Sequence, residues 1–418
     1  MNAHAPKVLR LAVAIAALNL CATALAAGPS AITTFDTRHG DGRVSPFYTW
    51  QEAVPAQPGK LLRHEPLDAS VGLGSAGQQY RILFSSTDGV GGEQPITVSG
   101  ALFLPKGQAP AGGWPIVAWG HGTLGVADIC APSWQGRSYR DVRYLNAWLD
   151  EGYAVVASDY QGIGVPGPNP QFNNRSNAYS ILDSARAALD GFQGLSNKVL
   201  LVGQSQGGSA VVVAAGYAPE YAPDLDVLGT IGTGIVYRPA RAVKAVTSPD
   251  PDALNRVDPS IAYGFYHVVA AQALDPSVRG EDIYTELALP LLEQARTHCL
   301  ATLSADAVGL GLTRANTLKN PAGDKAYNAP ADDVGRPFPT VKLTQPLFIG
   351  VGLKDGLVSA GVALAEDACA AGTVTQIHVY EGKDHSGTVN ESLKDSLPFA
   401  RQVLAGEKVA ARCKADNL

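Results

Sequence analysis

Gly203-Gln204-Ser205-Gln206-Gly207 decides the fold of this chain, because it places a serine between a predicted strand and a predicted helix. The apolar run 198–202 before it is typical of a buried strand, and the small apolar residues 208–215 after it are typical of a helix packed on that strand. A Cβ at either flanking glycine would crowd the neighbouring backbone. A turn this sharp strains the serine backbone and lifts its hydroxyl clear of the sheet. The stretch therefore predicts Ser205 as a nucleophile.

Strands and helices alternate on both sides of this motif. Strands are predicted at 80–84, 96–104, 115–119, 153–158, 226–231, 346–351 and 376–380, and helices at 140–151, 177–192 and 393–404. The first two strands are expected to pair as an antiparallel hairpin. The alternation that follows predicts an α/β fold with a mostly parallel sheet flanked by helices. With a serine at the strand-to-helix turn, this is the α/β-hydrolase fold.

The chain divides into predicted parts. Residues 1–26 are typical of a secretory signal peptide, with positive charges, an apolar run and Ala24-Leu25-Ala26 as the cleavage site. Residues 27–75 are expected to form an irregular N-terminal arm, and the α/β core is predicted to comprise 76–236 and 341–418. Residues 237–340 interrupt the alternation, which predicts a helical cap over the site rather than a remote decoration. Apolar side chains there, such as Ile261, Tyr263, Phe265 and Leu287, are expected to line an acyl pocket.

Charge, hydropathy and cysteine content indicate what kinds of partner and compartment the chain is suited to. The 418 residues carry 32 basic and 38 acidic side chains and no basic run, which argues against nucleic-acid binding. After the signal, no segment is long and apolar enough to span a bilayer, so we expect no stable membrane insertion. The chain is expected to be secreted or periplasmic, and monomeric. Four cysteines remain after the signal (Cys130, Cys299, Cys369 and Cys413), and an even number predicts two disulfides without fixing their pairing.

The histidine that would activate the serine can be chosen by position. A serine nucleophile needs a histidine to take its proton and a carboxylate to orient that histidine, and in α/β-hydrolases both follow the serine. Four histidines follow Ser205, at positions 267, 298, 378 and 385. The first two fall in the expected cap, and the third lies inside the last predicted strand. His385 comes just after that strand, so it is the predicted base.

The acid should follow the preceding strand, where the sequence offers Asp355. Asp384 is an alternative, but its adjacency to His385 points its side chain away from the imidazole. Asp332 and Asp333 are weaker alternatives, because a solvated loop explains them.

The oxyanion hole needs backbone N–H donors. One is predicted to be Gln206, at the start of the helix, and the other Thr123, with Gly122 close behind, in the loop after strand 115–119. His121 in the same loop is expected to fix the loop rather than act as a base. Residues 162–167 match the glycine pattern of dinucleotide sites, but the prolines that follow prevent the required helix. No dinucleotide cofactor is therefore expected, and the lack of an HExxH motif, of paired CxxC motifs and of a calcium-binding loop predicts no metal.

These motifs together resemble the secretory lipase family, which includes lipases of the Candida lipase A type. The resemblance rests on Gly203–Gly208, Cys130–Ser133, Asp159–Gly162, and the placing of Asp355 and His385. It implies a capped α/β-hydrolase that cleaves carboxylic esters, often of acylglycerols, without a metal. It also implies that Cys130 pairs with Cys299 and Cys369 with Cys413.

The sequence thus predicts a secreted serine ester hydrolase, a lipase or esterase, whose substrate is a small-molecule or lipid ester. Ser205 is the predicted nucleophile, His385 the base and Asp355 the acid. A serine peptidase or amidase on the same fold is one alternative, and a hydrolase of polyesters or acylated polysaccharides is another. A non-catalytic binding module is the third, and it would be expected to lack a member of the triad.

Overall fold

The computed structural model describes residues 43–239, 245–246, 252–321 and 338–415, together with Met1. The expected signal peptide beyond Met1 and residues 27–42 of the expected arm lie outside the described residues. So do Asp332 and Asp333, the weaker alternatives for the acid.

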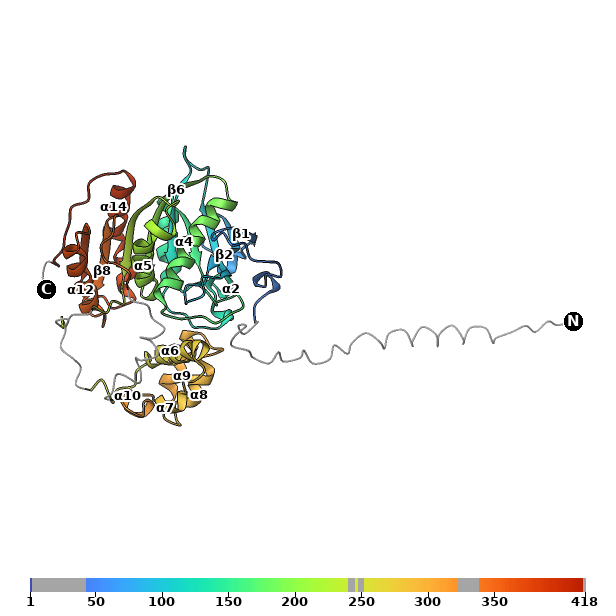
Figure 1. The fold of residues 1–418 in the computed structure, drawn as a ribbon, viewed down its shortest axis with the longest axis vertical. Coiled ribbons are helices and arrows are strands. Elements are labelled where there is room, and N and C mark those ends of the chain that lie inside the picture. The colour runs from blue at the N-terminus through green and yellow to red at the C-terminus, as the bar shows by residue number, and fades with distance from the viewer. Residues whose placement is uncertain (2–42, 240–244, 247–251, 322–337, 416–418) are drawn as a thin grey trace. The chain divides into compact units, whose positions relative to one another are not determined.

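A nine-stranded sheet with the order β1-β2-β3-β5-β4-β6-β7-β8-β9 forms the centre of the described chain (Figure 1). From β5 to β9 all neighbours are parallel, whereas β1, β2, β3 and β5 pair antiparallel. The strands are β1 (Leu61–Pro66), β2 (Ala76–Thr87), β3 (Pro95–Pro105), β4 (Trp114–Gly120), β5 (Ala154–Ser158), β6 (Leu195–Gln204), β7 (Val227–Thr233), β8 (Leu347–Gly352) and β9 (Thr375–Tyr380). The mostly parallel sheet agrees with the prediction.

The expectation of a wholly irregular arm over 27–75 is wrong for its last part. Residues 61–66 form β1, which adds an edge strand to the sheet through antiparallel pairing with β2. Two short 3-10 helices, η1 (Pro46–Tyr48) and η2 (Ala69–Val71), also lie in this segment, and a third, η3 (Asp128–Cys130), follows β4. The strand was missed because Arg63, His64 and Glu65 give it no apolar alternation.

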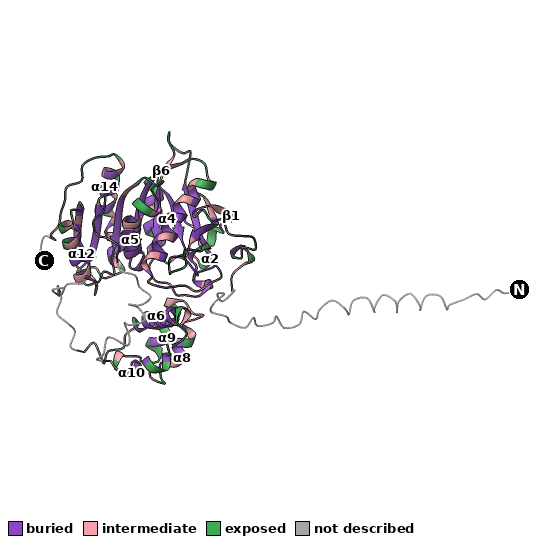
Figure 2. Ribbon diagram, in the orientation of Figure 1, coloured by how far each residue is buried: buried purple, intermediate pink, exposed green. Residues whose placement is uncertain are grey.

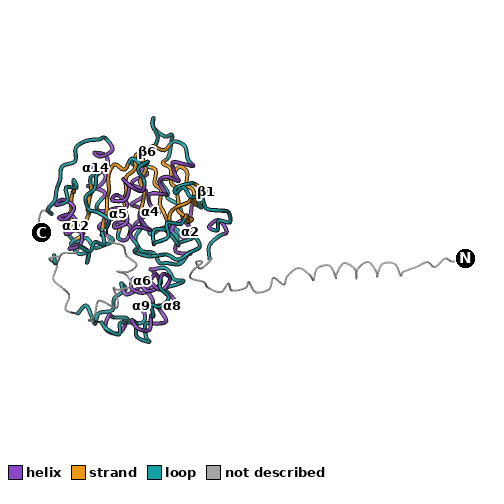
Figure 3. Tube along the Cα trace, viewed as in Figure 1, coloured by secondary structure: helices purple, strands orange, loops and turns teal. Residues whose placement is uncertain are grey.

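Helices cover both faces of the sheet (Figure 3). Those of the core are α2 (Pro132–Gln135), α3 (Tyr139–Asp150), α4 (Asn174–Gly191), α5 (Gln206–Tyr221), α12 (Val358–Ala370), α13 (Gly387–Glu391) and α14 (Leu393–Leu404). Alternate residues of a strand belong to different cores: in β4, Ile116 and Ala118 pack with α4 and α5, whereas Val117 and Trp119 pack with α3 and α14. Figure 2 shows the strands buried between these layers. Continuous apolar runs such as 198–202 follow from burial on both faces.

The segment expected to be a cap contains five helices among its described residues. They are α6 (Ile261–Leu274), α7 (Gly280–Ile283), α8 (Leu289–Gln294), α9 (Leu300–Gly309) and α10 (Arg314–Thr317). They enclose an apolar cluster of their own, to which Ile261 and Phe265 belong, and the Phe265 ring centroid lies 4.8 Å from that of Tyr284. Ile261 and Phe265 are therefore interior side chains of this segment, and their part in an acyl pocket stays a prediction.

Two disulfides are present, with the pairing that the family resemblance implies. Cys130, at the end of η3, joins Cys299, which precedes α9 of the cap segment. The Leu300 N–H donates to the Leu124 carbonyl at 2.7 Å, so a hydrogen bond reinforces this connection. Cys369 in α12 joins Cys413 in the C-terminal segment. Among the described residues, no helix is long and apolar enough to cross a membrane.

Candidate active site

Ser205 occupies the sharp turn between β6 and α5. Its backbone has φ 59° and ψ −122°, a left-handed conformation that costs on the order of 1–3 kcal/mol in a non-glycine residue. The Ser205 N–H donates to the Thr233 carbonyl of β7 at 2.9 Å, which holds the turn in place. A Cβ at Gly203 would overlap the Gly207 carbonyl, and one at Gly207 would overlap the Gly120 carbonyl. The glycines of the motif are therefore required by close backbone contacts.

The structure brings His385 and Asp355 together at the ends of neighbouring strands. Asp355 follows β8 and His385 follows β9, and the Asp355 Oδ2 lies 2.8 Å from the His385 Nδ1. The carboxylate is 3% exposed, whereas the imidazole is 31% exposed. The other carboxylate oxygen accepts the Leu357 N–H at 2.9 Å, which fixes the aspartate. An Nδ1–H donated to Asp355 leaves the Nε2 of a neutral imidazole free to accept a proton.

Asp384 does not take part in this pair. Its Oδ1 accepts the Gly387 N–H at 2.7 Å, in the first turn of α13. The side chain therefore shapes the loop that carries His385, in keeping with the preference for Asp355 as the acid.

The Nε2 of His385 contacts Gln204, the residue before the predicted nucleophile, for which the sequence predicts no role. The Gln204 side-chain amide donates to this nitrogen at 2.9 Å, and no hydrogen bond between Ser205 and His385 is found among the described residues. Arg140 of α3 donates in turn to the Gln204 Oε1 at 3.1 Å. The one signal for this contact in the sequence is that Gln204 directly precedes Ser205.

The predicted oxyanion loop lies against the serine. A Cβ at Gly122 would lie 3.4 Å from the Ser205 Cβ, and the Thr123 hydroxyl donates to the Gln206 side-chain oxygen at 3.0 Å. Gln206 also donates from its amide to the Gln171 carbonyl at 3.0 Å. Within the described part of the chain, neither the Thr123 N–H nor the Gln206 N–H donates a hydrogen bond to another residue. Both remain available for a ligand oxygen, as an oxyanion hole requires.

A buried network of hydrogen bonds around Asp159 lies next to the loop that carries Gly122 and Thr123. Asp159, at the end of β5, accepts hydrogen bonds from the hydroxyls of Ser99 and Ser133 and from the Ser133 N–H. His121 contacts the Gly122 and Asp159 carbonyls through its two ring nitrogens, at 2.7 and 3.4 Å. Burial lowers the pKa of His121, which favours its neutral form. A neutral ring carries a single N–H, so one of these two carbonyls accepts a hydrogen bond from it, which helps to hold the loop as expected for His121.

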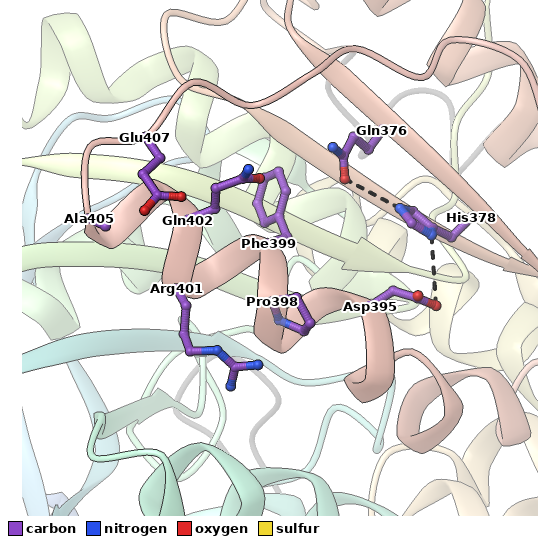
Figure 4. A pocket seen from close by; sticks show the side chains of 9 residues that line it. All are labelled: Gln376, His378, Asp395, Pro398, Phe399, Arg401, Gln402, Ala405 and Glu407. Atoms are coloured by element: carbon purple, nitrogen blue, oxygen red, sulfur yellow. Dashed lines mark hydrogen bonds and ion pairs between the residues drawn. The ribbon is translucent and has the colours of Figure 1, made fainter.

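The histidine of β9 forms a second histidine–carboxylate pair, away from the serine. His378 and Asp395 line a pocket of about 560 Å³, in which the His378 Nδ1 lies 3.7 Å from the Asp395 Oδ2 (Figure 4). The His378 ring stacks on Phe348 at 4.6 Å, and burial lowers its pKa. The nine residues that line this pocket include no serine, threonine or cysteine. The pair therefore has no nucleophile beside it.

Two side chains of α6 are affected by residues of the core. Burial raises the pKa of the Tyr263 hydroxyl, and the charge of Arg140 opposes that rise. One turn later, the His267 ring meets the Phe172 ring edge-on at 4.7 Å, beside Gln171. The remaining cap histidine, His298, contacts the Gln294 carbonyl through Nδ1 at 3.1 Å. The His267 ring therefore brings α6 against the segment that carries Gln171, whose carbonyl accepts from the Gln206 amide.

Part of the chain is similar in sequence to known lipases. The family model of the secretory lipases matches residues 138–249, which include the serine turn. The chain is related to the secretory lipases. It is 37% identical to "Lipase 7" of Candida albicans over 93 residues, 21% of each chain. It is 30% identical to a "Probable inactive lipase" of Mycobacterium tuberculosis over 203 residues, 44% of each chain. The chain thus spans less than half the length of these relatives.

A solved structure extends the comparison of the fold. Lipase A of Candida antarctica in its closed state superposes with a TM-score of 0.68 at 19% identity, covering 89% of this chain and 88% of that one. The α/β-hydrolase fold predicted from the serine turn is thereby confirmed.

Proposed function

We propose that this chain is a secreted serine hydrolase of carboxylic esters that acts through an acyl-enzyme on Ser205. One observation supports this most strongly: a serine in a strained turn lies at the same edge of the sheet as a hydrogen-bonded Asp355–His385 pair. Parallel strands place their carboxyl ends together, which is where the active sites of open α/β sheets lie. The relation to the secretory lipases favours an ester as the substrate.

In this proposal, each group performs one step. The Ser205 Oγ attacks the ester carbonyl carbon while its proton passes to the His385 Nε2, and Asp355 stabilises the imidazolium that forms. The Gln206 and Thr123 N–H groups stabilise the oxyanion, an effect typically worth about 10²–10³ in kcat for one donor. The imidazolium then protonates the leaving alcohol. Water attacks the acyl-enzyme with the help of the same histidine and releases the acid.

Export is part of the proposal. Two disulfides favour an oxidising compartment, and the first 26 residues have the composition of a signal peptide. A secreted triacylglycerol lipase of Malassezia furfur is among the relatives, at 26% identity over 207 residues. We propose that the mature chain acts as a monomer on small or lipid esters, which size-exclusion chromatography with light scattering would test.

The test of the nucleophile uses a p-nitrophenyl phosphonate, which transfers its phosphonyl group to an activated serine. Mass spectrometry should locate the adduct on Ser205 alone, and Ser205→Ala should lose labelling and about 10⁶ in kcat. Ser209→Ala is the matched control. Ser209 lies one turn further along α5, and its hydroxyl donates to the Val236 carbonyl. Labelling at another residue, or a tenth of the activity left in Ser205→Ala, would refute the assignment.

A further inference from the structure

The amide of Gln204 occupies the nitrogen that must accept the serine proton. With Nδ1–H donated to Asp355, the Nε2 of His385 offers a single lone pair. The Gln204 Nε2 lies 2.9 Å from it, so an amide hydrogen fills that acceptor. Ser205 and Gln204 therefore compete for the same lone pair, although they are adjacent in the chain.

Arg140 sets the direction of this amide. Its Nη2 donates to the Gln204 Oε1 at 3.1 Å, which leaves the NH₂ group pointing at the imidazole. Arg140 is itself held, because its Nε donates to the Asp141 carboxylate at 2.8 Å and its Nη1 lies 3.4 Å from the Ser386 Oγ. If the amide turned its oxygen to His385, it would lose the hydrogen bond to a charged donor. The NH₂ orientation is therefore the stable one.

We propose that Arg140 and Gln204 form a latch on His385, which holds Ser205 unactivated until the substrate displaces the amide. The inference rests on the proposed function. It adds no bond to the proposed reaction: the Gln204 hydrogen bond breaks first, and the proton of the Ser205 Oγ then passes to the vacated Nε2. Gln204 is thus a positioning residue that controls when the nucleophile reacts.

The surroundings of the amide explain how a substrate would release the latch. A Cβ at Gly122 would overlap the Gln204 Oε1, so the glycine of the oxyanion loop leaves room for this side chain. Gln204 is 1% exposed and lies between that loop and the histidine. The leaving oxygen of an ester held in the oxyanion hole must reach the His385 Nε2 to receive its proton. That oxygen would occupy the position of the amide.

The test measures the second-order rate of Ser205 phosphonylation from p-nitrophenolate release. Gln204→Met keeps the length of the side chain and removes the donor, so the rate should rise about 2- to 10-fold, the factor of one net hydrogen bond. Gln204→Glu can only accept from the Nε2, which favours the protonated ring, so the rate should fall at least about 10-fold. A merely structural role for Gln204 would slow both variants.

Two further variants complete the design. Arg140→Met should accelerate phosphonylation as Gln204→Met does, and the double variant should react no faster than Gln204→Met alone. Gln345→Met is the matched control, because this buried glutamine lies just before β8 and donates only to the Ala215 carbonyl at 3.4 Å. Its rate should equal that of the wild type. Melting temperatures confirm that each variant is folded.

The two hypotheses fail in different ways. A wild-type protein that is not labelled at Ser205 would refute the proposed function. A labelled wild type together with an equal or slower Gln204→Met would refute the latch and leave the hydrolase intact.

Discussion

His267 should make the stability of this protein fall as the pH falls. Neither ring nitrogen has a hydrogen-bond partner in the described structure, although both are buried between α6 and Phe172. Burial lowers the pKa of this histidine to about 4, and the charge of Arg238 acts in the same direction. The native state therefore holds His267 neutral over a range of pH in which the unfolded chain binds a proton.

The sign and size of the change in free energy of unfolding follow from the difference in the His267 pKa between the native and unfolded states. In the unfolded chain the pKa is about 6.5, so between pH 6.5 and 4 the unfolded state gains a proton that the native state does not. Above pH 6.5 the His267 side chain does not lower the free energy of unfolding. As the pH falls from 6.5 to 4, the free energy of unfolding decreases. Linkage gives a loss in free energy of unfolding of about 2 kcal/mol at pH 5 and about 3 kcal/mol at pH 4.

The perturbation is His267→Phe, which retains an aromatic ring against Phe172 and removes the titrating group. Guanidinium unfolding of both proteins at pH 7 and pH 5 should show that the wild type loses about 2 kcal/mol more than the variant. Asp183 acts with the opposite sign, because burial raises the pKa of its carboxyl to about 6. It is present in both proteins, so its contribution cancels. Equal losses in the two proteins would show that His267 is protonated without cost.

Three other predictions concern the site and its supports. Asp355→Asn should lower kcat on p-nitrophenyl acetate by about 10⁴, whereas Asp384→Asn should change it little; the reverse ranking would mean that the acid is Asp384. Replacing Cys130 and Cys299 together by serine should cost roughly 4 kcal/mol in denaturant unfolding, because their bridge spans 169 residues, and an unchanged midpoint would contradict this. Asp159→Asn should cost about 1–3 kcal/mol by the same measurement, because a buried carboxylate that accepts from Ser99 and Ser133 is lost; full stability would show that the amide replaces it.

The main elements of the fold could be predicted because local patterns encode them. Apolar runs gave the parallel strands, and the helix predicted at 393–404 has the observed bounds of α14. Chain order was enough to select Asp355 and His385, since each follows the end of its own strand. The edge strand β1 could not be predicted, because its side chains are half polar and its pairing with β2 is not a local property.

The contacts around the serine were predicted less completely. Gln204, Arg140 and His385 are 64 and 181 residues apart along the chain, so no spacing rule connects them. Their hydrogen bonds depend on where α3 and the loop after β9 lie in three dimensions. The cysteine pairing likewise needed the family resemblance, because four cysteines allow three pairings. The burial of Ile261 and Phe265 inside this helical segment was not predicted, because it depends on how its five described helices pack against one another.

The disulfide between Cys130 and Cys299 has a mechanical consequence. A Cβ at Gly125 would lie 2.8 Å from the Cys130 Sγ, so the bridge packs against the chain only two residues beyond Thr123. The cap segment is thus attached to the core at three points, by the chain at each end and by this bridge. If this segment moves as a rigid body, its displacement is smallest at the bridge, close to Thr123, and greatest on the side farthest from Cys299. If the segment covers Ser205 as predicted, an ester would enter on that far side while the Thr123 N–H keeps its position.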